Sequence, residues 1–227
     1  MLQTIKAVLL DIDNTLLDFD ACSRLSMEKS FAECGLPFES SMYHTFQQVN
    51  NGLWRRIEQG TLTRAELHAT RWTLVLQELG MKGDGPAVET RFLEHLAAEA
   101  IPVKGSYELL QYLYPKYTVC IASNAPYDQQ LKRLTTVDML RYFHKAFISE
   151  KLGAAKPSRE YFDACFAQLP DVPPEQCIII GDSLTADIGG GKAYGLHTCW
   201  YDHHQTGSNS PDADYTVTDL LEIKKIL

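Results

Sequence analysis

The sequence predicts an α/β fold, in which a parallel sheet carries helices on both faces and a group of helices is inserted after the first strand. Short apolar segments recur along the chain and indicate strands. They are continuous rather than alternating, as expected of strands that are covered on both faces. The predicted strands are IKAVLLDI (5–12), YTVCIAS (117–123), AFIS (146–149), QCIIIGD (176–182), HTCWY (197–201) and ADYTV (213–217).

Segments with helical periodicity separate these strands. Strands that alternate with helices are typical of a parallel sheet with both faces covered. The predicted helices of this part are SYELLQYLY (106–114), QQLKRLTT (129–136), SREYFDACFAQL (158–169), LTADIGGGKAYG (184–195) and TDLLEIKKIL (218–227).

Residues 21–100 interrupt this alternation, because they contain helical patterns and no convincing strand. Glycines end two of these helices, and Thr63 with Glu66 has the spacing of a capping box. The predicted helices are 24–35, 40–60, 62–80 and 87–100. We therefore expect a core formed by 1–17 and 104–227 and a helical cap at 18–103. An insert at this point lies over the carboxyl ends of the strands, where open α/β sheets bind ligands, so it is a candidate lid. The alternative is a helical bundle that serves only stability.

Composition and charge limit the functional classes. The chain has 227 residues, 45% of them apolar, with a formal net charge of −8. This acidic balance disfavours nucleic-acid polymers and anionic membranes as partners. No long apolar segment and no secretory pattern is present, so we expect a cytoplasmic protein.

The cysteines and one histidine pair are the remaining candidates for metal or redox chemistry. The six cysteines form no Cys-x-x-Cys pair, and we expect reduced, buried thiols rather than a disulfide or zinc framework. His203 and His204 lie in a loop-like segment, where a solvated turn is favoured over a metal site.

Acidic residues follow two of the predicted strands. Asp11 and Asp13 are two residues apart, so in an extended segment both point to the same face. Asp182 ends the strand at 176–182, and Asp187 follows where a helix should begin. If these two strands are neighbours, Asp11, Asp182 and Asp187 meet at one edge of the sheet. Like charges there repel, and Mg²⁺ is the cation that such carboxylates favour. Simple capping and solvation of strand ends is the alternative.

Two further segments carry groups that can bind phosphate. Ser123 ends the strand at 117–123, with Asn124 beside it, and a hydroxyl with backbone N–H groups in such a turn can hold phosphate oxygens. Lys156 precedes Pro157 and can bind phosphate as a point charge. Each residue alone is more typical of a turn or a surface, but their order beside the acidic residues favours a phosphate site.

These motifs together resemble the haloacid dehalogenase-like (HAD) hydrolases, in their phosphatase branch. The residues that match are Asp11-Ile-Asp13-Asn14-Thr15, Ser123-Asn124, Lys156-Pro157, and Gly181-Asp182 through Asp187. All four family motifs are present in order and span the whole core. The resemblance implies a Rossmann-like core with a helical cap inserted after the first motif.

The resemblance also implies a mechanism and a role for each motif residue. Asp11 attacks phosphorus and forms an aspartyl-phosphate, and Asp13 exchanges a proton with the leaving oxygen and then with water. Ser123, the amide of Asn124 and Lys156 hold the phosphoryl group. The implied Mg²⁺ ligands are Asp11, the backbone carbonyl of Asp13, Asp182 and Asp187, the last directly or through water.

Three other readings remain. A dehalogenase of this fold lacks the second acid and needs no metal, so Asp13 argues against it. A phosphorelay receiver domain is about half this length and has no inserted helices. A catalytically silent protein that binds a phosphorylated ligand is disfavoured because no motif residue is missing.

The expected substrate is a small phosphorylated metabolite. LLDFD (16–20), NNGLWRRIEQGTLTRAEL (50–67) and HTCWY (197–201) resemble the nucleoside 5′-monophosphate phosphatases, among them the pyrimidine nucleotidases. Sugar phosphates, phosphoglycolate or an acylneuraminate phosphate are the alternatives. Aromatic side chains could stack on a base, an asparagine could read its edge, and Asp20 could reject a second phosphate, although core packing is the commoner role of such aromatics. The stacking candidates are Phe19, Trp54 and Tyr127, and the edge-reading candidates are Asn50 and Asn51.

Overall fold

A parallel sheet forms the centre of the protein. The structure is a computed structural model that describes residues 4–208 and 210–227. Within that range the sheet has six parallel strands in the order β3-β2-β1-β4-β5-β6. The strands are β1 (Ala7–Leu10), β2 (Thr118–Ser123), β3 (Lys145–Ile148), β4 (Cys177–Gly181), β5 (His197–Tyr201) and β6 (Tyr215–Val217). Each overlaps its predicted segment, and the predicted α/β class is confirmed.

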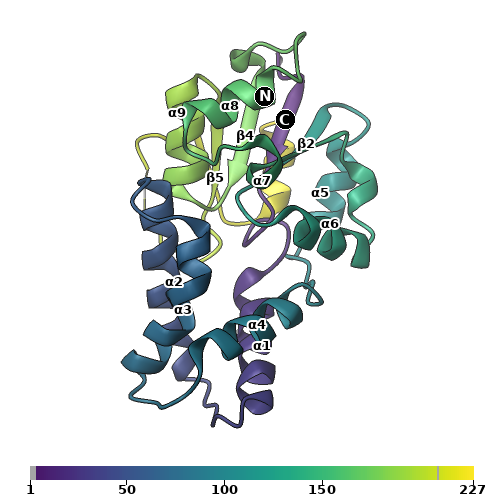
Figure 1. Ribbon diagram of the computed structural model, residues 1–227. Helices are drawn as coiled ribbons and strands as arrows, with labels where there is room; N and C mark the ends of the chain where they lie inside the picture. Colours follow the sequence, from purple (N-terminus) through teal and green to yellow (C-terminus); the bar gives the residue numbers. More distant parts are fainter. Residues whose placement is uncertain (1–3, 209) are drawn as a thin grey trace. The chain divides into compact units, whose positions relative to one another are not determined.

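Helices cover both faces of this sheet (Figure 1). The α-helices are α5 (Ser106–Leu113), α6 (Tyr127–Thr136), α7 (Ser149–Leu152), α8 (Arg159–Phe166) and α9 (Gly190–Tyr194). Short 3₁₀ turns are η1 (Leu140–Tyr142), η2 (Pro174–Gln176) and η4 (Leu220–Lys225), and η3 (Leu184–Gly189) is a π-helical turn.

Two predicted helices differ from what the structure has. The segment 184–195 divides into η3 and α9, because the N–H groups of Asp187 and Ile188 both donate to the carbonyl of Ser183 at 3.1 Å. The second of these bonds spans five residues and widens the turn. The segment 218–227 forms the 3₁₀ turn η4, which begins with a capping box between Asp219 and Glu222.

Alternate side chains of each strand enter two apolar clusters. Val8 and Leu10 of β1 face a cluster that contains Leu109 and Leu113 of α5 and side chains of η4. The intervening Leu9 faces the second cluster, with α8. Because successive side chains of a strand point to opposite faces, both faces must be apolar, which explains the continuous apolar segments of the sequence.

The inserted residues form a second compact unit. The chain divides into a sheet unit, which contains Ala100–Leu227 and the segment that ends at Phe19, and a helical unit, Asp20–Glu99. The helical unit contains almost all of α1 (Phe19–Glu33), together with α2 (Met42–Glu58), α3 (Arg64–Glu78) and α4 (Gly85–Leu96). The predicted capping box of Thr63 and Glu66 opens α3. The core of this unit is aromatic, and its buried rings are Phe31, Tyr43, Phe46, Trp72 and Phe92.

Two other features bear on the sequence predictions. In the described part of the chain, no helix has the length and apolar character needed to cross a membrane. All six cysteines are free, and Cys34 differs from the expected burial because it is half-exposed.

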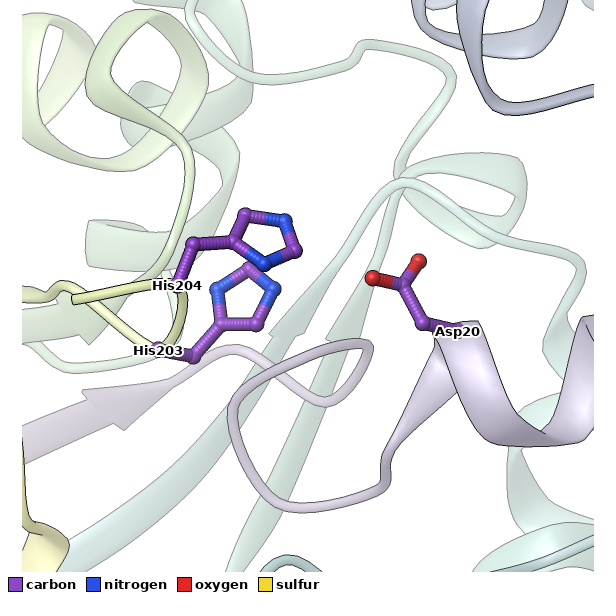
Figure 2. A group of neighbouring side chains, drawn as sticks. All are labelled: Asp20, His203 and His204. Carbon is purple, nitrogen blue, oxygen red and sulfur yellow. The ribbon is translucent and has the colours of Figure 1, made fainter. Parts of the chain in front are cut away.

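The histidine pair lies in the loop after β5. The ring centroids of His203 and His204 are 3.7 Å apart (Figure 2). The carboxylate of Asp202 accepts hydrogen bonds from the backbone N–H groups of Thr206 and Gly207, which turns this loop. Asp20, which is also drawn in Figure 2, belongs to the helical unit, where the hydroxyl of Tyr43 donates to its Oδ1 at 3.2 Å.

Candidate active site

The end of β1 places the first acidic residue. The N–H of Asp11 donates to the carbonyl of Ile180 at 2.9 Å and thereby continues the pairing of β1 with β4. The N–H groups of Leu16 and Leu17 then both donate to the carbonyl of Ile12, which closes a tight turn. Asn14 has a φ of 56°, in the left-handed region that asparagine tolerates better than most residues. The turn therefore holds the segment that follows Asp11 close to the strand end.

Three acidic residues meet at this edge of the sheet. One carboxylate oxygen from each of Asp11, Asp182 and Asp187 lies within 4.8 Å of the other two. The pairing of β1 with β4 brings them together, as the sequence predicted for neighbouring strands. Trp200 of β5 donates its Nε1–H to the carbonyl of Asp182 at 2.9 Å and fixes that turn. Three carboxylates at this spacing are hard oxygen donors, which fit a magnesium ion.

Lys156 is the cation at the centre of this cluster. Its Nζ donates to Asp11 Oδ1 at 2.8 Å, to Asp187 Oδ1 at 2.6 Å and to the carbonyl of Ala122 at 2.6 Å. All three donor positions of the ammonium are thereby used, and the side chain is buried. Asp187 also accepts from the N–H of Ser183 at 3.1 Å. The lysine thus links the strand end of β1 to the turn after β4.

The electrostatics of the cluster reflect an excess of negative charge. Burial raises the pKa of Asp11 to about 7, since desolvation and repulsion from Asp187 and Asp13 outweigh the attraction of Lys156. Burial and repulsion from Asp11 and Asp187 raise the pKa of Asp182 well above its usual value. Burial alone lowers the pKa of Lys156, but the carboxylates of Asp11 and Asp187 raise it overall, so the ammonium is charged. The single positive charge of Lys156 leaves two of the three carboxylate charges unbalanced. A divalent cation beside the lysine would neutralise them.

Ser123 and Asn124 lie at the end of the neighbouring strand β2. The hydroxyl of Ser123 accepts the N–H of Ala125 at 3.2 Å. The amide side chain of Asn124 makes two hydrogen bonds to the backbone of Lys156: its Nδ2 donates to the carbonyl, and its Oδ1 accepts from the N–H, both at 2.9 Å. Asn124 therefore fixes the lysine loop to the serine loop. Both residues reach the edge of the sheet that carries the acidic cluster.

Asp13 contacts partners different from those of Asp11. Arg133 donates from Nη1 to Asp13 Oδ1 at 2.5 Å, and Gln130 donates from Nε2 to Asp13 Oδ2 at 2.6 Å. Gln130 also donates to the hydroxyl of Ser123 at 3.1 Å. Gln130 and Arg133 were not among the site residues that we predicted from the sequence. The signal that was available is their spacing of three residues in the helix after the serine motif, which places both on one helical face.

The predicted substrate-contacting residues are divided between the two units. Phe19 and Tyr127 belong to the sheet unit, and the ammonium of Lys151 lies 4.9 Å from the ring centroid of Tyr127. Trp54 and Asp20 belong to the helical unit. The roles of these four residues toward a substrate stay predictions.

The structure gives Asn50 a different role from the one that we predicted. Asn50 is 2% exposed, and its Oδ1 accepts from Arg71 Nη1 at 3.0 Å. Arg71 also donates twice to Glu89, at 2.6 and 3.1 Å. The side-chain amide of Asn50 is therefore part of a buried hydrogen-bonded network inside the helical unit. This argues against the predicted role of Asn50, which was to form hydrogen bonds with the edge of a base. Asn51, which is exposed, remains the candidate for that role.

Comparisons with known proteins identify the family. The family model for haloacid dehalogenase-like hydrolases matches residues 5–195. The chain therefore belongs to the haloacid dehalogenase-like hydrolases, and it is an enzyme of the phosphatase kind within that family.

Individual relatives match along nearly the whole chain. The HAD-hydrolase YfnB of Bacillus subtilis is 34% identical over 97% of this chain and 92% of its own length. Its crystal structure, which was solved with magnesium bound and reveals interdomain movement, has a TM-score of 0.92 and covers 99% of both chains. The pyrimidine 5′-nucleotidase PynA of Streptococcus pneumoniae is 32% identical over 96% of this chain and 94% of its own. The pyrimidine 5′-nucleotidase YjjG of Escherichia coli is 27% identical over 97% and 96%.

Proposed function

We propose that this protein is a Mg²⁺-dependent phosphomonoesterase that acts through an aspartyl-phosphate on Asp11 and takes nucleoside 5′-monophosphates as substrates. The observation that carries the proposal is the cluster at the end of β1. There a buried carboxylate lies 2.8 Å from a charged lysine and close to two further carboxylates. This is the combination that a nucleophile for phosphorus and an adjacent hard cation require.

Asp11 is the proposed nucleophile. Its carboxylate attacks phosphorus, the bond from phosphorus to the leaving oxygen breaks, and the phosphoryl group remains on Asp11. Lys156 screens the negative charges of nucleophile and phosphate, which otherwise repel each other. Ser123 and the backbone N–H of Asn124 hold the phosphoryl oxygens. Asp11, Ser123 and Asn124 lie at strand ends, and Lys156 is hydrogen-bonded to Asp11 and Asn124, so the positions of these groups are fixed before a substrate arrives.

Asp13 is the proposed general acid and base. It donates a proton to the leaving alkoxide and then accepts a proton from the water that hydrolyses the acyl-phosphate. When bound, Mg²⁺ would neutralise charge on the carboxylates and on the transferring phosphoryl group. The groups that would hold it are the carboxylates of Asp11, Asp182 and Asp187 and the backbone carbonyl of Asp13. The magnesium reported for the YfnB crystal structure supports this assignment.

Nucleoside 5′-monophosphates are the proposed substrates because two relatives named as pyrimidine 5′-nucleotidases match over nearly their full length. In this proposal the helical unit is a cap that covers the substrate. Phe19, Trp54 and Tyr127 would stack on the base, and Asp20 would disfavour a second phosphate.

The test is phosphate release from a panel of esters, measured with Mg²⁺ and with EDTA. The panel contains pyrimidine and purine 5′-monophosphates, a 3′-nucleotide, phosphoglycolate and hexose phosphates. We expect Mg²⁺-dependent turnover that is fastest with 5′-monophosphates, and none with the Asp11→Asn variant. A preference for sugar or acid phosphates would keep the mechanism and overturn the substrate. An absence of turnover by the folded protein on every ester would favour the silent binding protein.

A further inference from the structure

We propose that Gln130 and Arg133 of α6 are positioning residues that hold the carboxylate of Asp13 for proton transfer and connect it to Ser123. The inference rests on the role proposed above for Asp13. It adds two residues that are not members of the four sequence motifs.

The geometry around Asp13 is a closed hydrogen-bonded network. Arg133 Nη1 reaches Oδ1 of Asp13 at 2.5 Å, and Gln130 Nε2 reaches Oδ2 at 2.6 Å, so both carboxylate oxygens are held. Arg133 Nη1 also donates to Gln130 Oε1 at 3.1 Å, which fixes the orientation of the amide. Gln130 Nε2 in turn donates to the hydroxyl of Ser123 at 3.1 Å. One amide group therefore contacts both the proposed proton carrier and the proposed phosphate ligand.

The burial of this network indicates that it does more than anchor a helix. The side chain of Arg133 is 0% exposed, whereas that of Asp13 is 26% exposed. A fully buried guanidinium has a large desolvation cost, which only close partners offset. In this site the arginine is inside the protein and the carboxylate it binds reaches the surface of the sheet edge. The buried guanidinium of Arg133 thus forms a rigid support for the partly exposed carboxylate of Asp13.

A rigid support matters because proton transfer requires hydrogen-bond distance to the leaving oxygen. An aspartate that rotates freely about its side-chain bonds reaches that geometry only part of the time. Two donors on two different oxygens remove this freedom, and the planar guanidinium loses little entropy when it binds. The connection through Gln130 sets the position of Asp13 relative to the phosphate ligand Ser123. Misplacement by about 1 Å can cost on the order of 100-fold in rate.

The experiment compares two leaving groups in the same enzyme sample. An alkyl phosphate, the best nucleotide of the panel, needs a proton on its leaving oxygen, whereas a nitrophenyl phosphate releases a stable phenolate without one. The ratio of the two kcat/KM values therefore reports general-acid catalysis up to loss of the leaving group. Because both values come from one preparation, the ratio does not depend on the folded fraction. Asp13→Asn serves as the reference for complete loss of the acid.

The variants are Gln130→Leu, Arg133→Met and Arg133→Lys, with Lys132→Met as the matched control. Lys132 is the exposed neighbour of Arg133 on the same helix, so the control also removes a cation from α6. General acid catalysis contributes about 100- to 10,000-fold, and we expect Gln130→Leu and Arg133→Met to lower the alkyl-to-aryl ratio at least about tenfold. Arg133→Lys should recover part of the loss, because it retains a positively charged donor. Lys132→Met should leave the ratio unchanged.

The outcomes separate this inference from the function on which it rests. Suppose that Asp13→Asn lowers the alkyl-to-aryl ratio while the Gln130 and Arg133 variants lower the kcat/KM of both substrates by the same factor. In that case the two residues serve only stability, and the inference is wrong. If Asp13→Asn leaves the ratio unchanged, the proposed role of Asp13 fails, and the inference fails with it. If Lys132→Met changed the alkyl-to-aryl ratio as much as Arg133→Met, the inference would also be wrong. The change in ratio would then come from the loss of a positive charge on α6 and not from the lost contact with Asp13.

Discussion

Gly181 is the position where the geometry of the site predicts the sharpest effect of a single methyl group. It ends β4, immediately before Asp182. A Cβ built on Gly181 would lie 2.2 Å from Oδ2 of Asp187 and 2.4 Å from its Cγ. Ordinary van der Waals contact begins near 3.4 Å, so in Gly181→Ala the carboxylate has to move by more than an ångström.

That movement breaks contacts that are worth a substantial free energy. Asp187 is 1% exposed and accepts from Lys156 Nζ and the N–H of Ser183. Overpacking of a core typically costs about 1–3 kcal/mol. Breaking a buried ion pair by removing one partner costs about 3–5 kcal/mol. Because Asp187 is displaced rather than removed, we expect Gly181→Ala to lower the free energy of unfolding by about 3 kcal/mol. It should also weaken Mg²⁺ binding at least about tenfold.

The matched control is the same substitution at Gly52. This residue lies inside α2, and apart from its chain neighbours and the backbone of its own helix a Cβ there would meet no atom within 4 Å. Gly52→Ala should stabilise the protein by up to about 1 kcal/mol through helix propensity alone. Urea unfolding gives the stabilities, and isothermal titration calorimetry gives the Mg²⁺ affinities. If Gly181→Ala unfolds within about 0.5 kcal/mol of the wild type and binds Mg²⁺ equally well, Asp187 does not hold the position that we describe.

Three further predictions concern Asp11, Arg71 and Asp20. The pKa of Asp11 is raised from its usual 3.8 to about 7 in the folded protein. Between pH 3.8 and pH 7 the folded chain therefore keeps a proton on Asp11 that the unfolded chain releases. The free energy of unfolding consequently falls as the pH rises through this range. At about 1.4 kcal/mol per pKa unit, urea unfolding in EDTA should therefore show Asp11→Asn gaining about 4 kcal/mol relative to the wild type between pH 4 and pH 8, and a constant difference would contradict the electrostatic account. Arg71→Met leaves Glu89 buried without its guanidinium partner and should cost about 3 kcal/mol; a cost below about 1 kcal/mol would show that the network contributes little. Asp20→Asn should raise turnover of nucleoside diphosphates relative to monophosphates, and an unchanged ratio in steady-state kinetics would remove Asp20 from substrate selection.

The sheet and the acidic cluster could be predicted because both depend on local sequence patterns. Strands buried on two faces must be continuously apolar, so Ala7–Leu10 and Cys177–Gly181 stand out from the sequence. A carboxylate directly after such a strand lies at the edge of the sheet. Once β1 and β4 are neighbours, Asp11 and Asp182 must therefore come close together.

The remaining contacts could not be predicted because they depend on side chains that are distant in sequence. The amide of Asn50 is a side-chain type that often binds ligands. Only the packing of α3 against α2 shows that its Oδ1 accepts a hydrogen bond from Arg71. Asp13 and Arg133 are 120 residues apart, and their ion pair exists because α6 follows β2, the neighbour of β1. The division of 184–195 into a π-helical turn and a short α-helix depends on two N–H groups that share the carbonyl of Ser183, which helical periodicity does not reveal.

The central claim is that Asp11 carries the phosphoryl group during turnover. The most direct test is to quench the enzyme during the hydrolysis of its best substrate, reduce the trapped acyl-phosphate with borohydride, and identify the modified residue by peptide mass spectrometry. We expect Asp11 to be converted to homoserine only when substrate is present, and EDTA to abolish the conversion. Active turnover with no modification at Asp11, or with modification of another carboxylate, would contradict it.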